Sequence, residues 1–411
     1  MEFPDSSCVS TAAAKKSAEF VLPPGLLLST DFPPMLGGIA SYLFSVYSDF
    51  RLDKLTLIAP SFAGSPAFDA TQNYRAERIE PSSAFRGWRV VDYVVRTYER
   101  AKPLARRDPR LVLHCGHIRA AFAARRLKKR FGTPYLVWTH ALEIMDKLLA
   151  RPIRNALCEA DLVLTNSEYT QNFVRSLGVP QSRLATVRPG TSAERFGAGA
   201  GARALASGLG LDGKRVLLTI GTLQRRFRYK GQDMVIRALP EVVRRFPDVL
   251  YLIAGAGDDS AYLQRLAQEC SVASHVRVLG PVEAADIPLL YHCCDIFLMC
   301  SREERTFRGM LAEGFGVVFL EASASGKPII AGNSGGVPDA VRNGVTGLLV
   351  DPRSAAEIRD AILRLLGDAS LRHELGTNGR VWVEREMTLE RAAQQFRRAY
   401  NNAFPRCPIT C

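Results

Sequence analysis

The chain has 411 residues, of which 47% are hydrophobic and 23% are charged, a composition typical of a globular protein with two or three domains. No stretch is apolar for long enough to cross a membrane, and Pro23 and Pro24 interrupt the apolar run nearest the N-terminus, which argues against a signal peptide. The net charge of +13 favours a phosphate-bearing partner or an anionic membrane surface, although solvated helix faces would explain it equally well.

The positive charge is concentrated in the first half of the chain. Residues 84–130 contain fourteen lysines and arginines but only three acidic residues. This segment is the predicted site of peripheral contact with an anionic membrane. Because its cations are not interleaved with stacking aromatic residues, and no DNA- or RNA-binding module is apparent, nucleic acid is not the expected partner.

The nine cysteines form no CxxC pair, which favours reduced, buried thiols and a cytoplasmic location, peripheral to the inner face of the cell membrane if the basic segment contacts lipid. His114 and His117 are close in sequence, but no set of carboxylates or thiols with metal-ligand spacing accompanies them. We therefore predict neither a metal site nor a cofactor.

In chain order, short apolar strands alternate with amphipathic helical stretches. The predicted strands of the first half are residues 25–30, 54–60, 110–115, 134–140, 161–166 and 183–190. Those of the second half are residues 215–221, 249–255, 275–280, 295–300, 327–332 and 346–350. This alternation predicts an α/β protein with two tandem, Rossmann-like, doubly wound domains that face each other across a cleft.

The expected domain boundaries follow from composition. Residues 1–24 are expected to be loosely ordered, and residues 25–195 form the first domain. A Gly- and Ala-rich stretch, 196–213, is interpreted as a linker before the second domain, 214–386. Residues 387–411 comprise a long terminal helix, which could cross back to the first domain, and a tail.

Three turns between strand and helix have residues suited to an anionic ligand. Gly37 and Gly38 precede a helix whose first N–H groups are unpaired, although an ordinary tight turn explains them equally well. The second turn concentrates positive charge that would suit phosphates, and its cations are Arg225, Arg226, Arg228 and Lys230.

The third turn, EGFGVVFLE, places Glu313 and Glu321 on either side of a glycine-containing loop and a helix that starts near Val317. Gly316 would let a diphosphate approach the helix N-terminus. The two carboxylates would then hold hydroxyl groups on either side of it, as a nucleotide sugar requires: a sugar on one side and a ribose on the other.

These residues resemble the E-x7-E motif of the family 4 retaining glycosyltransferases, which have the GT-B fold. The resemblance extends over most of residues 25–355 and includes FPPMLGGIASY, WTHALE, RYKGQD and GNSGGVPDAV. It implies that residues 25–195 form the acceptor-side domain and residues 214–386 the nucleotide-sugar-binding domain.

The resemblance also implies roles for individual residues. Glu313 would contact the donor sugar, helped by the backbone around Phe315, Gly316 and Val317, and Glu321 would hold the ribose. Lys230 would neutralise the diphosphate, and Gly37 and Gly38 would close over the phosphates. His140 matches a family histidine near the reacting sugar, and the segment from Val278 to Val282 would border the base.

The chain departs from the family pattern after the strand that ends at Gly221. The family often has an arginine next, where this chain has Thr222, so Arg226 is our preferred replacement as phosphate ligand and Arg228 the alternative. Asp339 occupies a position where the family often has glutamate, and the charged insertion 302–312 is expected to shape the acceptor side.

The expected function is retaining transfer of a hexose, without a metal, to a glycan, lipid-linked or small-molecule acceptor. The segment EASASGKPIIAGNSGG favours GDP-mannose slightly over UDP-sugars as the donor. Cations and a helix N-terminus would stabilise the leaving diphosphate. The alternatives are an epimerase or phosphorylase on the same fold, an inactive nucleotide-sugar sensor, and a nucleic-acid-binding protein that uses the basic first domain.

Overall fold

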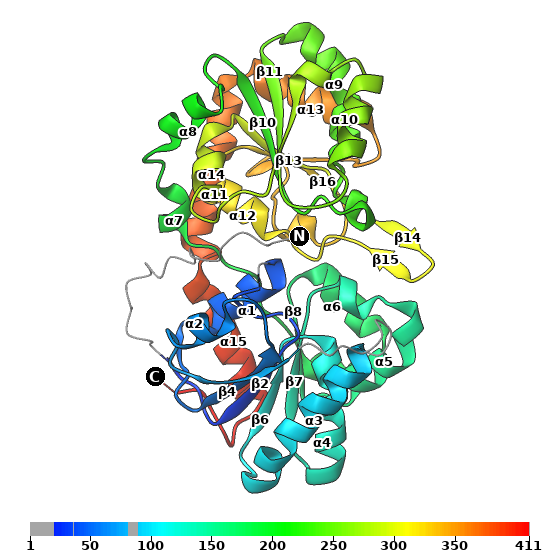
Figure 1. Ribbon diagram of the computed structural model, residues 1–411, viewed down its shortest axis with the longest axis vertical. Helices are drawn as coiled ribbons and strands as arrows, with labels where there is room; N and C mark the ends of the chain where they lie inside the picture. The colour runs from blue at the N-terminus through cyan, green and yellow to red at the C-terminus, as the bar shows by residue number, and fades with distance from the viewer. Residues whose placement is uncertain (1–19, 36, 81–88, 411) are drawn as a thin grey trace. The chain divides into compact units, whose positions relative to one another are not determined.

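The computed structural model describes residues 20–35, 37–80 and 89–410 and divides the chain into two compact units. Unit 1 comprises residues up to Pro189 together with Leu389–Cys411, and unit 2 comprises Gly190–Thr388. Each unit is built on its own parallel sheet (Figure 1). The predicted α/β class with two doubly wound domains is therefore confirmed.

In unit 1, seven parallel strands form a sheet in the order β5-β4-β2-β6-β7-β8-β9. The strands are β2 Gly25–Leu28, β4 Leu55–Pro60, β5 Arg75–Ile79, β6 Val112–Cys115, β7 Tyr135–Thr139, β8 Leu162–Thr165 and β9 Leu184–Thr186. The helices are α1 Gly38–Tyr47, α2 Ser65–Asp69, α3 Arg89–Arg107, α4 Ile118–Phe131, α5 Ala150–Cys158, α6 Glu168–Ser176 and α15 Leu389–Ala403. The strand order reverses between β2 and β6, where such sheets bind ligands.

In unit 2, six parallel strands form a sheet in the order β12-β11-β10-β13-β16-β17. The strands are β10 Arg215–Ile220, β11 Val249–Ala254, β12 Val276–Gly280, β13 Ile296–Met299, β16 Ile329–Gly332 and β17 Gly347–Val350, with a separate antiparallel hairpin of β14 Glu304–Thr306 and β15 Gly309–Leu311. The helices are α7 Ala193–Gly197, α8 Ala202–Gly208, α9 Gln232–Arg245, α10 Ser260–Glu269, α11 Ile287–Cys293, α12 Val317–Ala324, α13 Ala355–Gly367 and α14 Ala369–Glu386. Here the strand order reverses between β10 and β13.

All twelve predicted strands are present, each within two residues of its predicted start. Most of them are nearly continuous runs of buried residues, as parallel strands covered on both faces require, whereas the edge strands β9 and β12 are largely half-buried. Five strands of the described residues were not predicted: β5, the short pair β1 Phe20–Val21 and β3 Phe50–Arg51, and the hairpin strands β14 and β15. In β5 only Ile79 is buried, so the sequence offers no apolar run there.

Two predicted boundaries are corrected by the structure. Residues 196–213 are not a linker, because they contain α8 and the end of α7, and the side chains of Phe196 and Leu211 are buried in the core of unit 2. The expected disorder of residues 1–24 does not extend over 20–24, because Phe20 packs against Phe50 and Leu22 is fully buried. Residues 1–19 lie outside the described residues.

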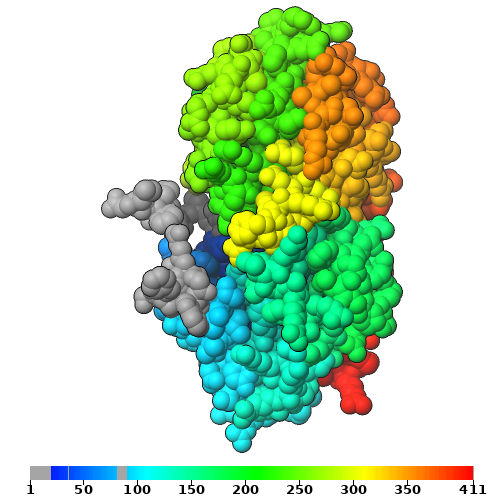
Figure 2. Space-filling view, turned by 90° about the vertical axis from the view of Figure 1, so that its right-hand side faces the viewer, coloured from blue at the N-terminus to red at the C-terminus, as the bar shows by residue number. Residues whose placement is uncertain are grey.

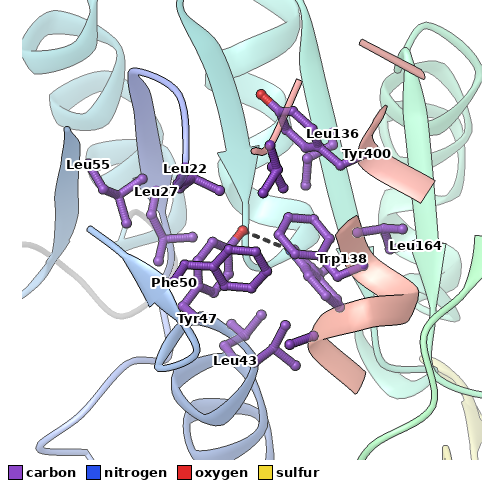
Figure 3. Packing of buried hydrophobic residues seen from close by; sticks show 14 of the residues in the cluster. Leu22, Leu27, Leu43, Tyr47, Phe50, Leu55, Leu136, Trp138, Leu164 and Tyr400 are labelled. Carbon is purple, nitrogen blue, oxygen red and sulfur yellow. Dashed lines mark hydrogen bonds between the residues drawn. The ribbon is translucent and has the colours of Figure 1, made fainter. Parts of the chain in front are cut away.

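The terminal helix belongs to unit 1, as the expected crossing back requires. In α15, Phe396 lies 5.1 Å from Trp138 and 5.5 Å from Tyr47 between ring centroids, so the helix supplies aromatic rings to the core of the first unit (Figure 3). A hydrogen bond from the Trp138 indole N–H to the Tyr47 hydroxyl, at 3.2 Å, lies inside this cluster. The helix is thus part of the first fold, and the predicted end of unit 2 at 386 agrees with Thr388 to within two residues.

The structure also explains His114, one of the two histidines considered as metal ligands. Its Nδ1 lies 2.8 Å from the Tyr47 hydroxyl, and its ring packs against Tyr400. Burial lowers the pKa of His114 to about 3, which keeps the imidazole neutral. His114 is therefore a residue of the aromatic core. Among the described residues, no helix is long and apolar enough to cross a membrane.

Candidate active site

Two of the side chains expected to hold the donor, the Glu313 carboxylate and the Lys230 ammonium, meet in unit 2. Lys230 follows β10 and Glu313 follows β13 and the hairpin, and these two strands are neighbours at the point where the strand order reverses. The Lys230 ammonium donates a hydrogen bond to Glu313 Oε2 at 2.8 Å. The side chains of Lys230 and Glu313 are 15% and 16% exposed, so the pair is largely shielded from solvent.

The pairing determines the charge of Lys230. Burial by itself would lower the pKa of this lysine, but the Glu313 carboxylate and the nearby Tyr229 outweigh that effect and raise it. Lys230 therefore stays cationic throughout the physiological pH range. A permanent cation at this position suits a diphosphate.

The loop between Glu313 and α12 depends on a glycine. Gly316 has a φ of +90°, and a Cβ there would lie 2.5 Å from the Phe319 ring. The Phe315 side chain is buried in the core, at 2% exposure, so only its backbone can face a ligand. Val317 is the first residue of α12, and the first N–H groups of a helix have no partner within it. This segment therefore combines a close backbone approach with an anion-binding helix end.

The second glycine cluster of the motif supports Glu313. The N–H of Gly336 donates to the Glu313 carbonyl at 2.8 Å. A Cβ on the adjacent Gly335 would lie 2.5 Å from the same carbonyl oxygen. The sequence GNSGG after β16 therefore holds the backbone of Glu313 in place, which the linear motif alone does not indicate.

Glu321 lies one turn into α12, as predicted, and has a partner that sequence reasoning missed. The Tyr291 hydroxyl, from α11, donates to Glu321 Oε2 at 2.7 Å. Burial raises the pKa of Glu321, while the Tyr291 hydrogen bond and the Arg195 charge oppose the rise. One carboxylate oxygen is thus fixed by the protein. No motif links Tyr291 to Glu321, because the two residues are brought together only by the packing of α11 on α12.

The basic loop after β10 separates its arginines into two environments. Arg228 is held by Asp259 at 2.7 Å and 2.5 Å, and its guanidinium lies 3.5 Å from the centre of the Tyr262 ring. Arg226 is exposed and donates to Gln224 at 2.8 Å. A surface hollow at this loop is lined by Gln224, Arg225, Arg226 and Asp258. Of the two proposed replacements for the family arginine, Arg226 is therefore the more accessible to a phosphate.

The two valines expected near the base lie on opposite faces of the sheet. Val278 packs against the core cluster formed with α9, α10 and α13. Val282 packs against the cluster that contains Phe315 and the residues of α12, on the side of Glu321. Of this pair, Val282 is thus the residue on the same side as the motif glutamates.

In unit 1, the glycine turn is open. Gly38 is the first residue of α1 and Gly37 is its N-cap, with no side-chain cap. A Cβ added at either glycine would meet no atom within 4 Å. The tight packing that would explain a purely structural glycine pair is therefore absent at these two described positions. The open backbone leaves room for a ligand group beside the start of α1.

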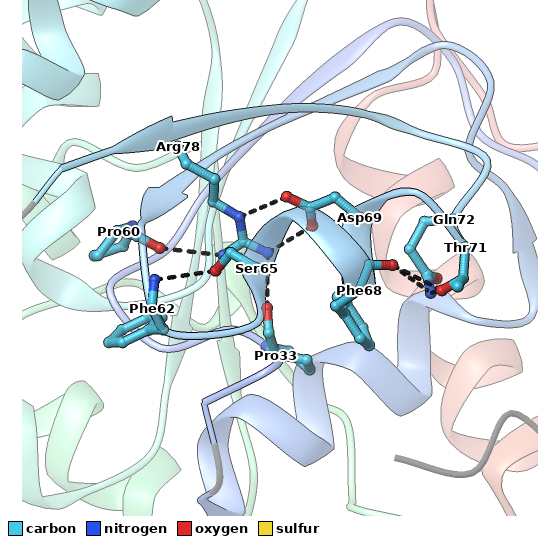
Figure 4. A network of polar contacts seen from close by, with 9 residues as sticks. All are labelled: Pro33, Pro60, Phe62, Ser65, Phe68, Asp69, Thr71, Gln72 and Arg78. Carbon is cyan, nitrogen blue, oxygen red and sulfur yellow. Dashed lines mark hydrogen bonds and ion pairs between the residues drawn. The ribbon is translucent and has the colours of Figure 1, made fainter. Parts of the chain in front are cut away.

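The loop that leads to these glycines is anchored by Arg78 of β5, a residue that sequence reasoning missed. Its guanidinium donates to both carboxylate oxygens of Asp69, at 2.9 Å and 2.7 Å, and to the carbonyls of Pro60 and Pro33 (Figure 4). The Arg78 side chain is only 10% exposed. A single arginine thus ties together the end of β4, the end of α2 and the loop after β2.

His140 follows β7 directly and lies at the carboxyl edge of the same sheet. Its Nε2 is 3.1 Å from the Gly116 carbonyl, and its backbone N–H donates to Glu143 Oε1 at 2.6 Å. The intervening Ala141 has a φ of +87°, an unusual conformation for a residue with a Cβ. Burial raises the pKa of Glu143, whose Oε2 is buried without a hydrogen-bond partner.

The structure also places His117 near His140. His117 caps α4, where its Nδ1 accepts the Arg119 N–H at 3.1 Å, and its Nε2 lies 3.8 Å from Asp31. Burial lowers the pKa of His117, and the neighbouring Arg119 and His140 lower it further. The carboxyl edge of unit 1 therefore gathers imidazoles and carboxylates from the loops after β2, β6 and β7. This grouping was not predicted from the sequence.

Comparison with known proteins identifies the family of the chain. The family model described as Glycosyltransferase Family 4 matches residues 36–195, and the model described as Glycosyl transferases group 1 matches residues 208–382. The chain is 35% identical over 366 residues to the GDP-mannose-dependent alpha-(1-6)-phosphatidylinositol monomannoside mannosyltransferase of Mycobacterium tuberculosis, covering 87% of this chain and 93% of the relative. It is 34% identical over 377 residues to the protein of the same name from Mycolicibacterium smegmatis, with the same coverage of 87% and 93%.

The fold has solved counterparts as well. The crystal structure of HepE from Anabaena, in complex with UDP and glucose, superimposes with a TM-score of 0.76 at 20% identity, covering 91% of this chain and 98% of that one. A likeness at this level of identity establishes the fold. Together with the two family models and the mycobacterial relatives, it shows that the chain belongs to the family 4 glycosyltransferases with the GT-B fold.

Proposed function

We propose that this glycosyltransferase moves mannose from GDP-mannose to a phosphatidylinositol mannoside or a closely related glycolipid. The names of the two mycobacterial relatives support both the donor and the acceptor class. The observation that carries the proposal for the donor is the Lys230–Glu313 pair beside the N-terminus of α12, with Glu321 one turn further on. A cation, free N–H groups and two carboxylates suit the diphosphate and the two sugars of one nucleotide sugar.

We infer the following division of roles. Glu313 accepts hydrogen bonds from the mannose hydroxyls, and the free oxygen of Glu321 accepts them from the ribose. Lys230, Arg226 and the N–H groups at the start of α12 face the diphosphate. Gly37 and Gly38 approach the phosphates from unit 1, and His140 lies beside the reacting sugar.

The proposed reaction retains the anomeric configuration and needs no metal. The bond between C1 of mannose and the diphosphate oxygen breaks, and negative charge develops on GDP. An acceptor hydroxyl attacks C1 from the same face, and the departing phosphate takes its proton. Preorganised cations and N–H groups are effective here because they stabilise the charge as it forms. A trapped glycosyl-enzyme intermediate would contradict this front-face mechanism.

The proposal includes peripheral contact between unit 1 and the cytoplasmic face of an anionic membrane. Within the described part of the basic segment, residues 89–130, several cations of α4 are already paired: Arg125 and Lys129 with Glu159, and Lys128 with Asp161. On α3, Val91 and Val95 are exposed one turn apart, in a helix that ends in Arg106 and Arg107. We therefore favour α3 over α4 as the helix that lies on the lipid surface.

The first test is binding of the nucleotide. The purified protein is titrated with GDP, UDP and ADP and with their sugar conjugates, and its melting temperature is compared with that of Glu321→Ala. We expect stabilisation by GDP and GDP-mannose that is lost in the variant, because ligand binding to the folded state raises its stability. Stabilisation by UDP alone would contradict the GDP-mannose assignment, and none by any nucleotide would contradict the donor site.

The second test is transfer itself. Radiolabelled GDP-mannose is incubated with phosphatidylinositol monomannoside in mixed micelles, with and without a chelator, and the product is analysed by NMR for its anomeric configuration. The proposal requires an α-linked product whose yield is unaffected by the chelator. Nucleotide binding without transfer to any glycolipid would instead identify a sensor, whereas salt-sensitive binding of nucleic acid without nucleotide binding would favour the basic first domain as the functional surface.

A further inference from the structure

The hairpin of β14 and β15 exposes an aromatic side chain at its tip. Phe307 is 86% exposed, more than any other large hydrophobic residue in the described part of the chain. Figure 1 shows the hairpin extending away from the body of unit 2, and Figure 2 shows the yellow segment that contains it at the molecular surface. Single exposed apolar residues are common on protein surfaces, so the case for a partner depends on the position of Phe307 at a hairpin tip and on the charges around it.

The tip of the hairpin is held by hydrogen bonds. The two strands pair in antiparallel register from Glu304 with Leu311 to Thr306 with Gly309, and the Thr306 hydroxyl donates to the Gly309 carbonyl at 3.1 Å. Only Phe307 and Arg308 lie in the turn between them. A two-residue turn closed by these contacts presents Phe307 outward in a fixed place.

The base of the hairpin is anchored to the donor site. Arg302 donates to both carboxylate oxygens of Asp233, at 2.9 Å and 3.2 Å, and its backbone N–H donates to the Tyr229 carbonyl at 2.8 Å. At the other end, the buried Ala312 connects Leu311 to Glu313. The residue two positions before the hairpin, Arg302, thus contacts Tyr229, which precedes Lys230 in the chain. The hairpin itself ends two residues before Glu313.

The charges on the hairpin select its partner. Arg305 and Arg308 are exposed on either side of Phe307, whereas Glu304 lies at the base, 3.9 Å from Arg302. An aromatic residue between two arginines suits the interface of an anionic membrane, where rings sit among the headgroups and cations meet phosphates. A stable protein partner would need an interface of roughly 800 Å² on each side, far more than one side chain offers.

We propose that the tip of this hairpin, Phe307 with Arg305 and Arg308, inserts into the headgroup region of the anionic membrane that carries the acceptor. The inference rests on the proposed lipid-linked acceptor. It assigns a membrane contact to unit 2, separate from the basic segment of unit 1. Because β15 ends two residues before Glu313, the lipid surface would be engaged six residues along the chain from the group that holds the donor sugar.

The test is sedimentation of the full chain with vesicles of phosphatidylcholine and phosphatidylinositol, and with phosphatidylcholine alone. Phe307→Ser should weaken binding to the anionic vesicles roughly tenfold, the effect of removing one buried phenyl ring. Arg305→Ser should weaken it about fivefold, and only on anionic vesicles. The matched control is Leu148→Ser, at a 66% exposed residue of unit 1, which should leave binding unchanged.

Equal vesicle binding by the wild type and Phe307→Ser, an equal loss in Leu148→Ser, or no binding by the wild type would each overturn the proposal. This assay uses neither donor nor transfer, so its failure is distinct from failure of the proposed mannosyl transfer; absence of binding by the wild type would also contradict the proposed membrane contact of unit 1. Melting temperatures check that each variant folds.

A second readout separates lipid contact from contact with the acceptor headgroup. Phe307→Ser should lose mannosyl transfer to vesicle-borne acceptor but keep transfer to the deacylated, water-soluble acceptor. Equal loss on both would place Phe307 against the headgroup and overturn the membrane assignment.

Discussion

The carboxyl edges of the two sheets use different means to prepare for a ligand. In unit 2, the edge presents charged side chains that are close in the linear motif or on neighbouring loops, and Lys230 and Glu313 pair directly at 2.8 Å. In unit 1, the edge presents open glycine backbone and His140. Arg78 of another strand anchors the loop that leads to the glycines, and Glu143, three residues further along the same loop, holds the backbone of His140. We infer from this comparison that unit 2 provides charged side chains for the ligand, and that unit 1 provides open backbone that leaves space for it.

The largest expected effect tests the charge in unit 2. Lys230→Ala should lower kcat/KM about a hundredfold or more, because the cation that faces the leaving diphosphate is removed. The measurement is initial-rate mannosyl transfer to a water-soluble acceptor. Lys128→Ala is the matched control, since Lys128 also forms an ion pair, at 2.7 Å with Asp161, but lies in α4 of unit 1. Near-normal turnover in Lys230→Ala would show that unit 2 does not act through this charge.

The second prediction concerns pH. Burial raises the pKa of Glu321 above its ordinary value of 4.5, so the folded protein binds this proton more tightly than the unfolded chain does. Between 4.5 and the raised pKa, acidification therefore increases the contribution of Glu321 to folding stability. Acidification should lower the affinity for GDP over the same pH range, because a protonated carboxyl group accepts hydrogen bonds from the ribose less well than a carboxylate does.

Calorimetric titration with GDP at a series of pH values measures this effect, with thermal unfolding recorded in parallel. Glu321→Gln should bind GDP roughly tenfold more weakly at neutral pH and should lose the decline on acidification. If the variant and the wild type showed the same pH profile, the decline would have to come from another group.

A third prediction sharpens the assignment of the missing family arginine. Arg226→Ala should weaken GDP binding about tenfold with little change in the melting temperature, because Arg226 is exposed and its contacts are with the nearby residues Gln224 and Phe227 of the same loop. Arg228→Ala should do the reverse, costing about 1 kcal/mol of stability with little change in affinity, because Arg228 is committed to Asp259. The two variants are compared by calorimetry and thermal unfolding, and an exchange of these outcomes would make Arg228 the phosphate ligand.

The smallest expected effect tests shape in unit 1. Gly38→Ala adds a methyl group where nothing lies within 4 Å and should leave stability unchanged or raise it by up to about 1 kcal/mol, since alanine favours helix. It should nevertheless raise KM for GDP-mannose several-fold, because the methyl group occupies space proposed for the phosphates. Unchanged kinetics would show that the turn is not part of the donor site.

The elements of the fold were predictable because they depend on local patterns. Buried parallel strands such as Val249–Ala254 are continuous apolar runs, and α12 begins where the glycines end. The linker prediction for 196–213 was wrong because a segment rich in glycine and alanine can form either a flexible linker or a short helix such as α8, and only the burial of Phe196 and Leu211 in the core of unit 2 distinguishes the two. β5 was missed because its single buried residue leaves no pattern to detect.

The sequence by itself determined the family, the two parallel-sheet domains and the positions of Glu313, Glu321 and Lys230, because spacing along one loop and one helix turn fixes where those groups can lie. Only the tertiary structure decided which partners hold them. Tyr291 reaches Glu321 from another helix, and Arg78 of β5 reaches the Pro33 carbonyl in the loop after β2, 45 residues earlier in the chain. Such contacts arise from the packing of separate elements, and packing depends on side-chain shape across the whole core rather than on any local pattern.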